Sequence, residues 1–267
     1  MTTTLIVRDI HLGARNSQAA SLSRLLRTHF DRLILNGDTV DSLNFRRFRS
    51  GHWAILDQLR SIARERELIL IRGNHEGVGT VSEPGFGPLD VLVQLLGTEL
   101  REEYQLRVGT DRYLVFHGDR FDRTLGTTWL VDVADYFYRT AQRCSLSLAA
   151  WLKGRVKHWG GVVGGVRRSA VEYARQKGCQ GVIIGHTHYH ADELVKGIRY
   201  LNTGSWVERP CNYILAEGSD IRLCSWQENS CVWQPNRSWR PTAVSPAAYF
   251  QGRPAFGPCS VESLSAS

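Results

Sequence analysis

The chain has 267 residues, of which 42% are hydrophobic and 22% are charged, enough apolar material for one sizeable core. No apolar run approaches the roughly 18–20 residues that span a bilayer. The start, "MTTTLIVRDIHLG", lacks the basic and long apolar regions of a secretory signal. These features disfavour the membrane-spanning and secreted classes, so we expect a cytoplasmic protein. Its six cysteines include no CxxC pair, and we expect reduced thiols.

The formal net charge is +7 and the sequence pI is about 9.3. Residues 120–177 contain eleven Lys or Arg and four Asp or Glu, so this segment carries the whole surplus. Such a local excess is typical of a surface that meets an anionic partner. A solvated helix face without a partner is the alternative.

Strand and helix patterns alternate through the first part of the chain and give way to hairpins. We expect strands at 4–9, 32–38, 68–76, 104–108, 112–119 and 181–188, helices at 17–30, 51–66 and 89–97, and hairpins at 193–205 and 213–226. Ser50 is the expected N-cap of the second helix, and Gly97 ends the third. This order predicts an α/β protein with mixed sheets.

Two segments depart from the alternation. Residues 120–177 have helical stripes of apolar residues and two glycine pairs, at 160–161 and 164–165, which would permit close helix approach or act as a hinge. Residues 227–267 hold five of the eight prolines. We expect this second segment to be a poorly ordered tail.

Short polar blocks follow the expected strands, at the sheet edge where α/β proteins bind ligands. The blocks are "DIH" (Asp9, His11), "GDTVD" (Asp38, Asp41), "GNHE" (Asn74, His75, Glu76), "HGD" (His117, Asp119) and "GHTH" (Gly185, His186, His188). Each block alone is weak, since an HxH pair can simply share one strand face. Their combination indicates a metal centre.

The mixture of Asp, His and Asn donors without cysteine suits Mn²⁺, Fe, Zn²⁺ or Co²⁺. A central carboxylate, Asp38, could bridge two ions. Two ions about 3.5–4 Å apart are a known device for in-line displacement at phosphorus.

The ordered blocks D-x-H, G-D-x-x-D, G-N-H-E, H-G-D and G-H-T-H resemble the calcineurin-like metallophosphoesterase superfamily over residues 1–226. The resemblance implies a four-layer α/β/β/α sandwich, with residues 120–177 as a helical insertion or lid. Within the superfamily, "HGDRFD" (117–122), "NTGSWVE" (202–208) and the basic insertion are similar to the bacterial UDP-2,3-diacylglucosamine pyrophosphatases. Those enzymes cleave a lipid A precursor at the inner membrane.

The resemblance implies two divalent ions, for which we expect Mn²⁺ first. One ion would be held by Asp9, His11, Asp38 and His188, the other by Asp38, Asn74, His117 and His186. A metal-bridging hydroxide would attack the phosphorus, and His75 would stabilise the transition state or protonate the leaving group. A substrate contact is expected at Arg8, and either a substrate contact or a structural role in the turn at Asp119 and Asp122. We expect Asp41 to orient a ligand or cap the following segment, and His190 to be a bystander or at most a substrate-side contact.

Three residues depart from the lipid A pattern: Arg8 replaces the usual Ser, Ser205 replaces Asp, and His75 replaces Arg. The leading hypothesis is hydrolysis of the pyrophosphate of a UDP-diacylglucosamine-like lipid. The alternative is a phosphodiesterase or phosphatase with another substrate, nucleotide or nucleic acid included. We expect an acylated nucleotide-sugar and an anionic membrane surface as partners, the latter through 120–177 on the cytoplasmic face of the inner membrane. We expect neither a protein partner nor nucleic acid.

Overall fold

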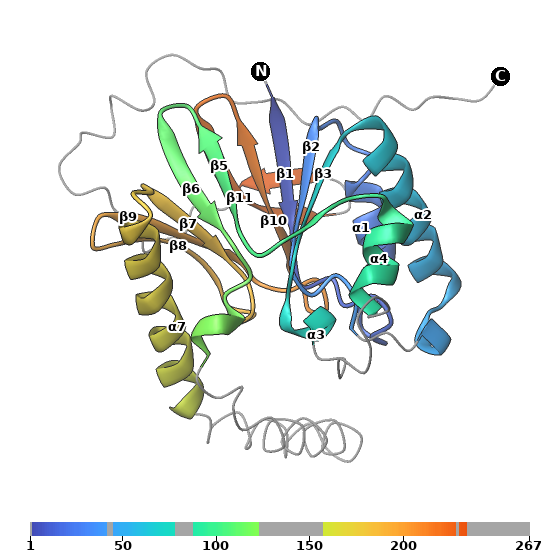
Figure 1. Ribbon diagram of the computed structural model, residues 1–267, viewed down its shortest axis with the longest axis horizontal. Coiled ribbons are helices and arrows are strands. Elements are labelled where there is room, and N and C mark those ends of the chain that lie inside the picture. Colours follow the sequence, from blue (N-terminus) through green and yellow to red (C-terminus); the bar gives the residue numbers. More distant parts are fainter. Residues whose placement is uncertain (1, 42–44, 78–87, 123–156, 228–229, 234–267) are drawn as a thin grey trace.

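The computed structural model in Figure 1 describes residues 2–41, 45–77, 88–122, 157–227 and 230–233. Two sheets lie face to face, with helices on the outer side of each (Figure 1). The layers are therefore helix, sheet, sheet and helix. This confirms the four-layer sandwich that we expected.

The first sheet has seven strands in the order β12-β11-β10-β1-β2-β3-β4. Strands β1 (Thr3–Val7), β2 (Arg32–Asn36), β3 (Glu67–Ile71) and β4 (Leu100–Arg101) are parallel, and β10 (Cys211–Glu217), β11 (Asp220–Gln227) and β12 (Ser230–Trp233) continue the sheet as antiparallel strands. Leu5 pairs with Leu33 across β1 and β2, and Leu33 pairs with Leu68 across β2 and β3.

The second sheet has five strands in the order β5-β6-β7-β9-β8. Its members are β5 (Tyr104–Val108), β6 (Asp111–Val115), β7 (Gly181–Ile184), β8 (His190–Val195) and β9 (Ile198–Thr203), and β6, β7 and β9 are parallel. The β8–β9 hairpin turns at Lys196 and Gly197, as expected, and both residues have the positive φ that a tight turn requires.

Three apolar cores separate the four layers. In β1, β2 and β3 the leucines face the helices, whereas Ile6, Ile34 and Ile69 pack between the two sheets. In β7, Ile183 joins the core between the sheets and Val182 faces the opposite helix. Burial of both faces explains why these strands appear in the sequence as continuous apolar runs.

Three helices cover the first sheet, and one covers the second (Figure 1). The first three are α1 (Ala19–Leu25), α2 (Ser50–Glu65) and α4 (Pro88–Leu96), the fourth is α7 (Lys157–Gln176), and α3 (Asn74–Gly77), η1 (Phe45–Arg47) and η2 (Asp119–Phe121) are single turns. Helix α2 begins one residue earlier than expected, because Arg49 is its N-cap and Ser50 is already helical.

Two expected boundaries change. Residues 230–233 form an edge strand paired with β11, so the tail that we placed at 227–267 begins inside a sheet. Helix α7 packs Val166, Ala170 and Ala174 against the second sheet, so this part of 120–177 is an outer layer of the fold. The remainder of the expected insertion, 123–156, and of the tail, 234–267, lies outside the described residues.

The glycine pair, the cysteines and the length of the helices can also be compared with what the sequence predicts. Among the described residues, a methyl group at Gly165 would meet nothing within 4 Å and one at Gly164 only Arg168, so this glycine pair brings none of the described helices close. Cys179, Cys211 and Cys224 are buried, and Cys179 and Cys211 are free thiols. Among the described residues, no helix is both long enough and apolar enough to cross a membrane.

Candidate metal centre

The candidate ligands lie in loops that follow the parallel strands. β1 leads to Asp9 and His11, β2 to Asp38, β3 to Asn74, β6 to His117, and β7 to His186 and His188. Because parallel strands end at the same edge of a sheet, both sheets deliver their ligands to one end of the sandwich, beside α3 in Figure 1.

The ligand loops have unusual backbone conformations. Among the described residues, six that are not glycine have a positive φ, and five of these are candidate ligands: Asp9, His11, Asp38, His186 and His188. Side chains other than glycine rarely adopt this left-handed region, and such conformations concentrate at functional sites.

Close packing fixes the loops in place. The backbone N–H groups of Asp9 and His11 donate to the carbonyls of Gly37 and Asp38, at 3.1 and 2.9 Å. A Cβ at Gly37 would lie 2.3 Å from Nδ1 of His117. Only glycine leaves room for that imidazole.

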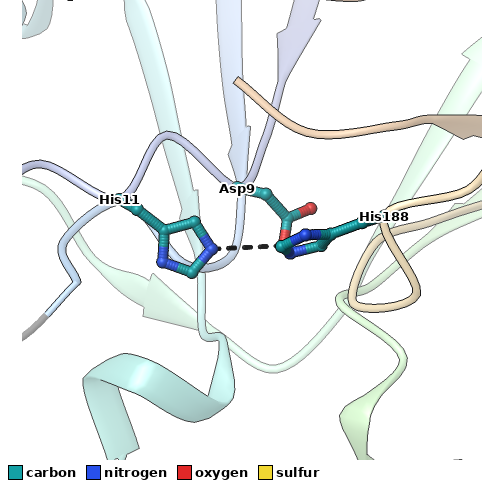
Figure 2. A group of neighbouring side chains, drawn as sticks. All are labelled: Asp9, His11 and His188. Atoms are coloured by element: carbon teal, nitrogen blue, oxygen red, sulfur yellow. Dashed lines mark ion pairs between the residues drawn. The ribbon is translucent and has the colours of Figure 1, made fainter. Parts of the chain in front are cut away.

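One group of donors comprises Asp9, His11 and His188. Figure 2 shows the two imidazoles on either side of the Asp9 carboxylate. Nε2 of His188 lies 3.3 Å from Oδ1 of Asp9, and Nε2 of His11 lies 3.9 Å from the same oxygen. Oδ1 of Asp9 and Nε2 of His11 are buried and have no hydrogen-bond partner among the residues that the structure describes. Such orphaned polar atoms are costly unless a cation joins them, so these residues fit a metal ion.

The second group comprises Asp38, Asn74, His117 and His186. Oδ1 of Asn74 lies 3.1 Å from Nε2 of His117 and 3.0 Å from Nδ1 of His186. Nε2 of His117 lies 3.3 Å from Oδ2 of Asp38. Two imidazoles, a carboxylate and an amide oxygen therefore converge, which again is a donor set for a borderline divalent ion.

Asp38 lies between the two groups. Its Oδ2 is 3.3 Å from Nε2 of His117 and 3.7 Å from Nε2 of His11. Its Oδ1 accepts the backbone N–H of His75 at 2.9 Å, which orients the carboxylate. One oxygen of Asp38 thus faces both donor groups, as a bridging ligand must.

The buried charges interact strongly. Burial raises the pKa of the Asp38 carboxyl, but the charge of His117 and a hydrogen bond from it outweigh burial and hold that pKa below its usual range. Burial lowers the pKa of His117, and Asp38 reverses this and raises it to about 10. Burial lowers the pKa of His11 to about 4, although Asp38 and Asp9 oppose the shift. In the metal-free protein, the charge of the Asp38 carboxylate is therefore stabilised mainly by protonated His117.

The candidate ligands His117 and His186 have a hydrogen-bond partner behind the ring, and His11 has a carboxylate behind it at a longer distance. Nδ1 of His117 lies 3.2 Å from the carbonyl of Asn36, and Nδ1 of His11 lies 3.7 Å from the Asp41 carboxylate. These two rings therefore present Nε2 to the site. His186 has the reverse arrangement, with Nε2 2.8 Å from Oδ2 of Asp122 and Nδ1 directed to the site. Such partners orient metal-binding histidines.

His75 lies at the rim of the site. Its side chain is 38% exposed, and its ring packs edge-on against that of His11 at a centroid distance of 4.6 Å. Nδ1 lies 3.0 Å from the carbonyl of Asp41. Burial lowers the pKa of His75, but Asp38 and the Asp41 carbonyl outweigh it and raise that pKa. The ring is both accessible from solvent and close to the donors.

The structure buries Arg8, at which we expected a substrate contact. Arg8 is 1% exposed, and its guanidinium contacts Asp9 Oδ2 and Asn202 Oδ1 and donates to Thr203 Oγ1 at 2.9 Å. Arg8 therefore holds the ligand Asp9 from behind. Ser205 has a similar position, since its Oγ lies 3.4 Å from the Asp9 carbonyl.

The other residues considered for substrate contact have different surroundings in the structure. Asp122 contacts the ligand His186, as described above, and its partner is a protein side chain. His190 is exposed on β8 and stacks on Tyr189, outside both donor groups. The substrate contact at Asp119 stays a prediction. The sequence did not identify Arg47, which pairs with Asp41 at 2.6 Å, or the carbonyl of Asn36.

Comparison with known proteins identifies the family. Residues 3–217 match the model of the calcineurin-like phosphoesterase superfamily domain. No curated protein matches the chain.

Solved structures resemble the chain at low identity. A phosphoesterase from E. coli, Yfce, is 15% identical with a TM-score of 0.46, covering 86% of this chain and 96% of its own. Wild-type Vps29 from Entamoeba histolytica, in complex with Zn²⁺, is 18% identical with a TM-score of 0.47, covering 87% and 97%. An archaeal phosphodiesterase is 13% identical with a TM-score of 0.41, covering 84% and 99%. The assignment rests on the domain match over most of the chain: this protein belongs to the calcineurin-like phosphoesterase superfamily.

Proposed function

We propose that the protein is a dinuclear metal-dependent phosphohydrolase. The observation that carries the proposal is Oδ2 of Asp38, which faces Nε2 of His11 at 3.7 Å and Nε2 of His117 at 3.3 Å. A carboxylate oxygen shared by two donor groups is the arrangement that a pair of ions requires. Mn²⁺ is the ion we expect first, because the donors are oxygen and imidazole nitrogen.

Bound ions would supply Lewis-acid activation of the phosphoryl group and an activated water. The chain's own residues arrange this chemistry. Asp122 accepts a hydrogen bond that orients His186, the Asp41 carboxylate lies 3.7 Å from His11, and Arg8 holds Asp9 from behind. These contacts fix the donors before substrate arrives.

His75 is the residue we assign to the leaving group. Its ring is accessible, and the nearby charge of Asp38 favours its protonated form. A protonated imidazole can donate a proton to the departing oxygen. Its hydrogen bond to the Asp41 carbonyl uses Nδ1, which leaves Nε2 for the substrate.

The substrate that we propose is a UDP-diacylglucosamine-like lipid A precursor, cleaved at its pyrophosphate. The proposal is supported by "HGDRFD" and by the basic segment 120–177, which would meet an anionic membrane surface. The motif "NTGSWVE" supports it less, because Asn202 and Trp206 contact Arg8 and the Asp9 backbone.

A second candidate is a phosphodiesterase acting on another substrate. His75 favours it, since the lipid A enzymes that the sequence resembles carry Arg at this position. The two candidates use the same metal centre and differ only in what binds beside it.

Purified protein with Mn²⁺ should be offered UDP-2,3-diacylglucosamine, bis(p-nitrophenyl) phosphate and single-stranded DNA. UMP release from the first substrate alone supports the lipid assignment. Turnover of the others without the first rejects it and favours the phosphodiesterase. Asp38→Asn is the control, and activity that survives in this variant would arise from a contaminant or from another mechanism.

A further inference from the structure

A pocket of about 330 Å³ lies beside the first turn of α2, away from the metal ligands. Its lining contains no Asp or Glu. The residues that surround it are Arg15, Ser17, Gln18, Ala19, Ala20, Ser21, Arg49, Ser50, Gly51, His52 and Arg209. The pocket is therefore a concave surface with cationic and neutral walls only.

Its three arginines lack carboxylate partners. Arg15, Arg49 and Arg209 are exposed, and within the described parts of the chain none of them has an Asp or Glu oxygen within 4 Å. Arg209 donates only to the neutral Gln18, at 3.3 Å. Many other arginines are paired, as Arg199 is with Asp192 at 2.9 Å. Three uncompensated guanidinium groups around one cavity favour an anion.

Helix α2 and His52 add further donors to the same wall. The side chain of His52 caps the N–H of the N-cap residue Arg49, and the N–H groups of Ser50 and Gly51 in the first turn of α2 lie beside the pocket. His52 is 5% exposed, and its Nδ1 accepts the N–H of Arg49 at 3.2 Å. Burial, and then the charge of Arg49, lower the pKa of His52, so the ring is neutral and Nε2 carries its proton.

The pocket is linked to the metal centre through the backbone. The N–H of Trp206 donates to the carbonyl of Asp9 at 3.0 Å, and the N–H of Gln18 donates to the carbonyl of Trp206 at 2.9 Å. Arg15 follows the ligand His11 by four residues. An anion in the pocket would therefore contact loops that also position candidate metal ligands. None of those ligands lines the pocket.

We propose that this pocket is a second phosphate-binding site, in which Arg15, Arg49 and Arg209 hold a phosphate group that is not the one hydrolysed. Arginine suits phosphate because its planar fork can donate two hydrogen bonds to two oxygens. The phosphate could belong to a soluble ion or to a phospholipid headgroup, since both present the same oxygens. The proposal stands independently of which substrate the metal centre cleaves.

The test measures binding of inorganic phosphate by calorimetry in the Asp38→Asn variant, which removes competition from the metal centre. Added substitutions R49Q and R209Q should weaken binding about fivefold each, the effect of about one cationic contact. The matched control is R60Q, which removes the same charge from an exposed position of α2 about 15 Å further along its axis. If Asp38→Asn does not fold, His188→Ala replaces it as the background.

Phosphate binding that survives R60Q and is lost with R49Q and R209Q supports the site. Equal binding in all variants, or no binding once Asp38 is changed, overturns it. A sedimentation assay then identifies the source of the phosphate. Binding to phosphatidylglycerol vesicles but not to phosphatidylcholine vesicles, abolished by R49Q and R209Q, assigns a lipid headgroup. Calorimetric binding without sedimentation assigns a soluble phosphate.

Discussion

Asp122 offers the sharpest test of how the metal centre is built. Its Oδ2 lies 2.8 Å from Nε2 of His186, and the two side chains are only 9% and 11% exposed. A hydrogen bond of this kind to a charged group contributes about 1.5–3 kcal/mol, and every 1.4 kcal/mol corresponds to about a tenfold change in affinity. We therefore expect Asp122→Ala to weaken one of the two metal sites by about 10–100-fold.

The assay is a calorimetric titration of metal-free protein with Mn²⁺, read as two binding steps. Only the step that involves His186 should weaken, because His186 is the candidate ligand that Asp122 contacts among the described residues. Asp122→Asn keeps an acceptor oxygen for the imidazole N–H and should lose less affinity than Asp122→Ala. Asp119→Ala is the matched control on the same turn.

Wild-type affinity for both ions in Asp122→Ala would refute the reasoning. So would an equal loss at both sites, because it would show that Asp122 supports the loop as a whole. The same titration at two ionic strengths distinguishes a direct contact from long-range attraction, since a buried contact is screened weakly by salt.

Four further predictions follow from the same geometry. Asp38→Ala should lose both ions together, measured as metal content after dialysis, because one oxygen faces both groups. Arg8→Met should destabilise the metal-free protein to urea by about 3 kcal/mol, since it leaves a buried carboxylate without its partner. The melting temperature of the metal-free protein should fall from pH 7 to 10: the pKa of His117 is raised to about 10, so its stabilisation is complete below pH 6.5 and is lost as the pH rises through 10. His190→Ala should leave metal content unchanged, whereas His188→Ala should reduce it.

Each of these has a result that contradicts it. Loss of a single ion in Asp38→Ala would exclude a shared ligand, and an unchanged urea midpoint in Arg8→Met would show that Asp9 has another partner. A flat pH profile, or one that persists in His117→Gln, would remove His117 as the cause. Reduced metal in His190→Ala would place that side chain in the site.

The metal ligands could be predicted from the sequence because they are local. A DxH or HxH pair after an apolar run places two donors in one loop, and the strand pattern then brings two such loops and three single-donor loops to one end of the sandwich. The leucine and isoleucine runs of β1, β2 and β3 likewise predicted buried parallel strands. Short-range spacing was sufficient for both.

Contacts between distant segments could not be predicted in this way. The burial of Arg8 depends on Asn202 and Thr203, which lie nearly 200 residues away in the sequence. The role of Asp122 depends on His186, which lies 64 residues further on. The strand at 230–233 was missed because its proline-rich surroundings dominated the local composition.

The positive φ angles of the candidate ligand loops lower the stability of the protein at the same residues that supply its metal donors. Left-handed backbone costs roughly 1–2 kcal/mol for a residue other than glycine, and Asp9, His11, Asp38, His186 and His188 all adopt it. Glycine at any of these positions would relieve that cost and remove a donor at once. Selection of variants for heat resistance in a chelating medium should therefore erode the metal centre before the core, and the same selection with Mn²⁺ present should preserve it.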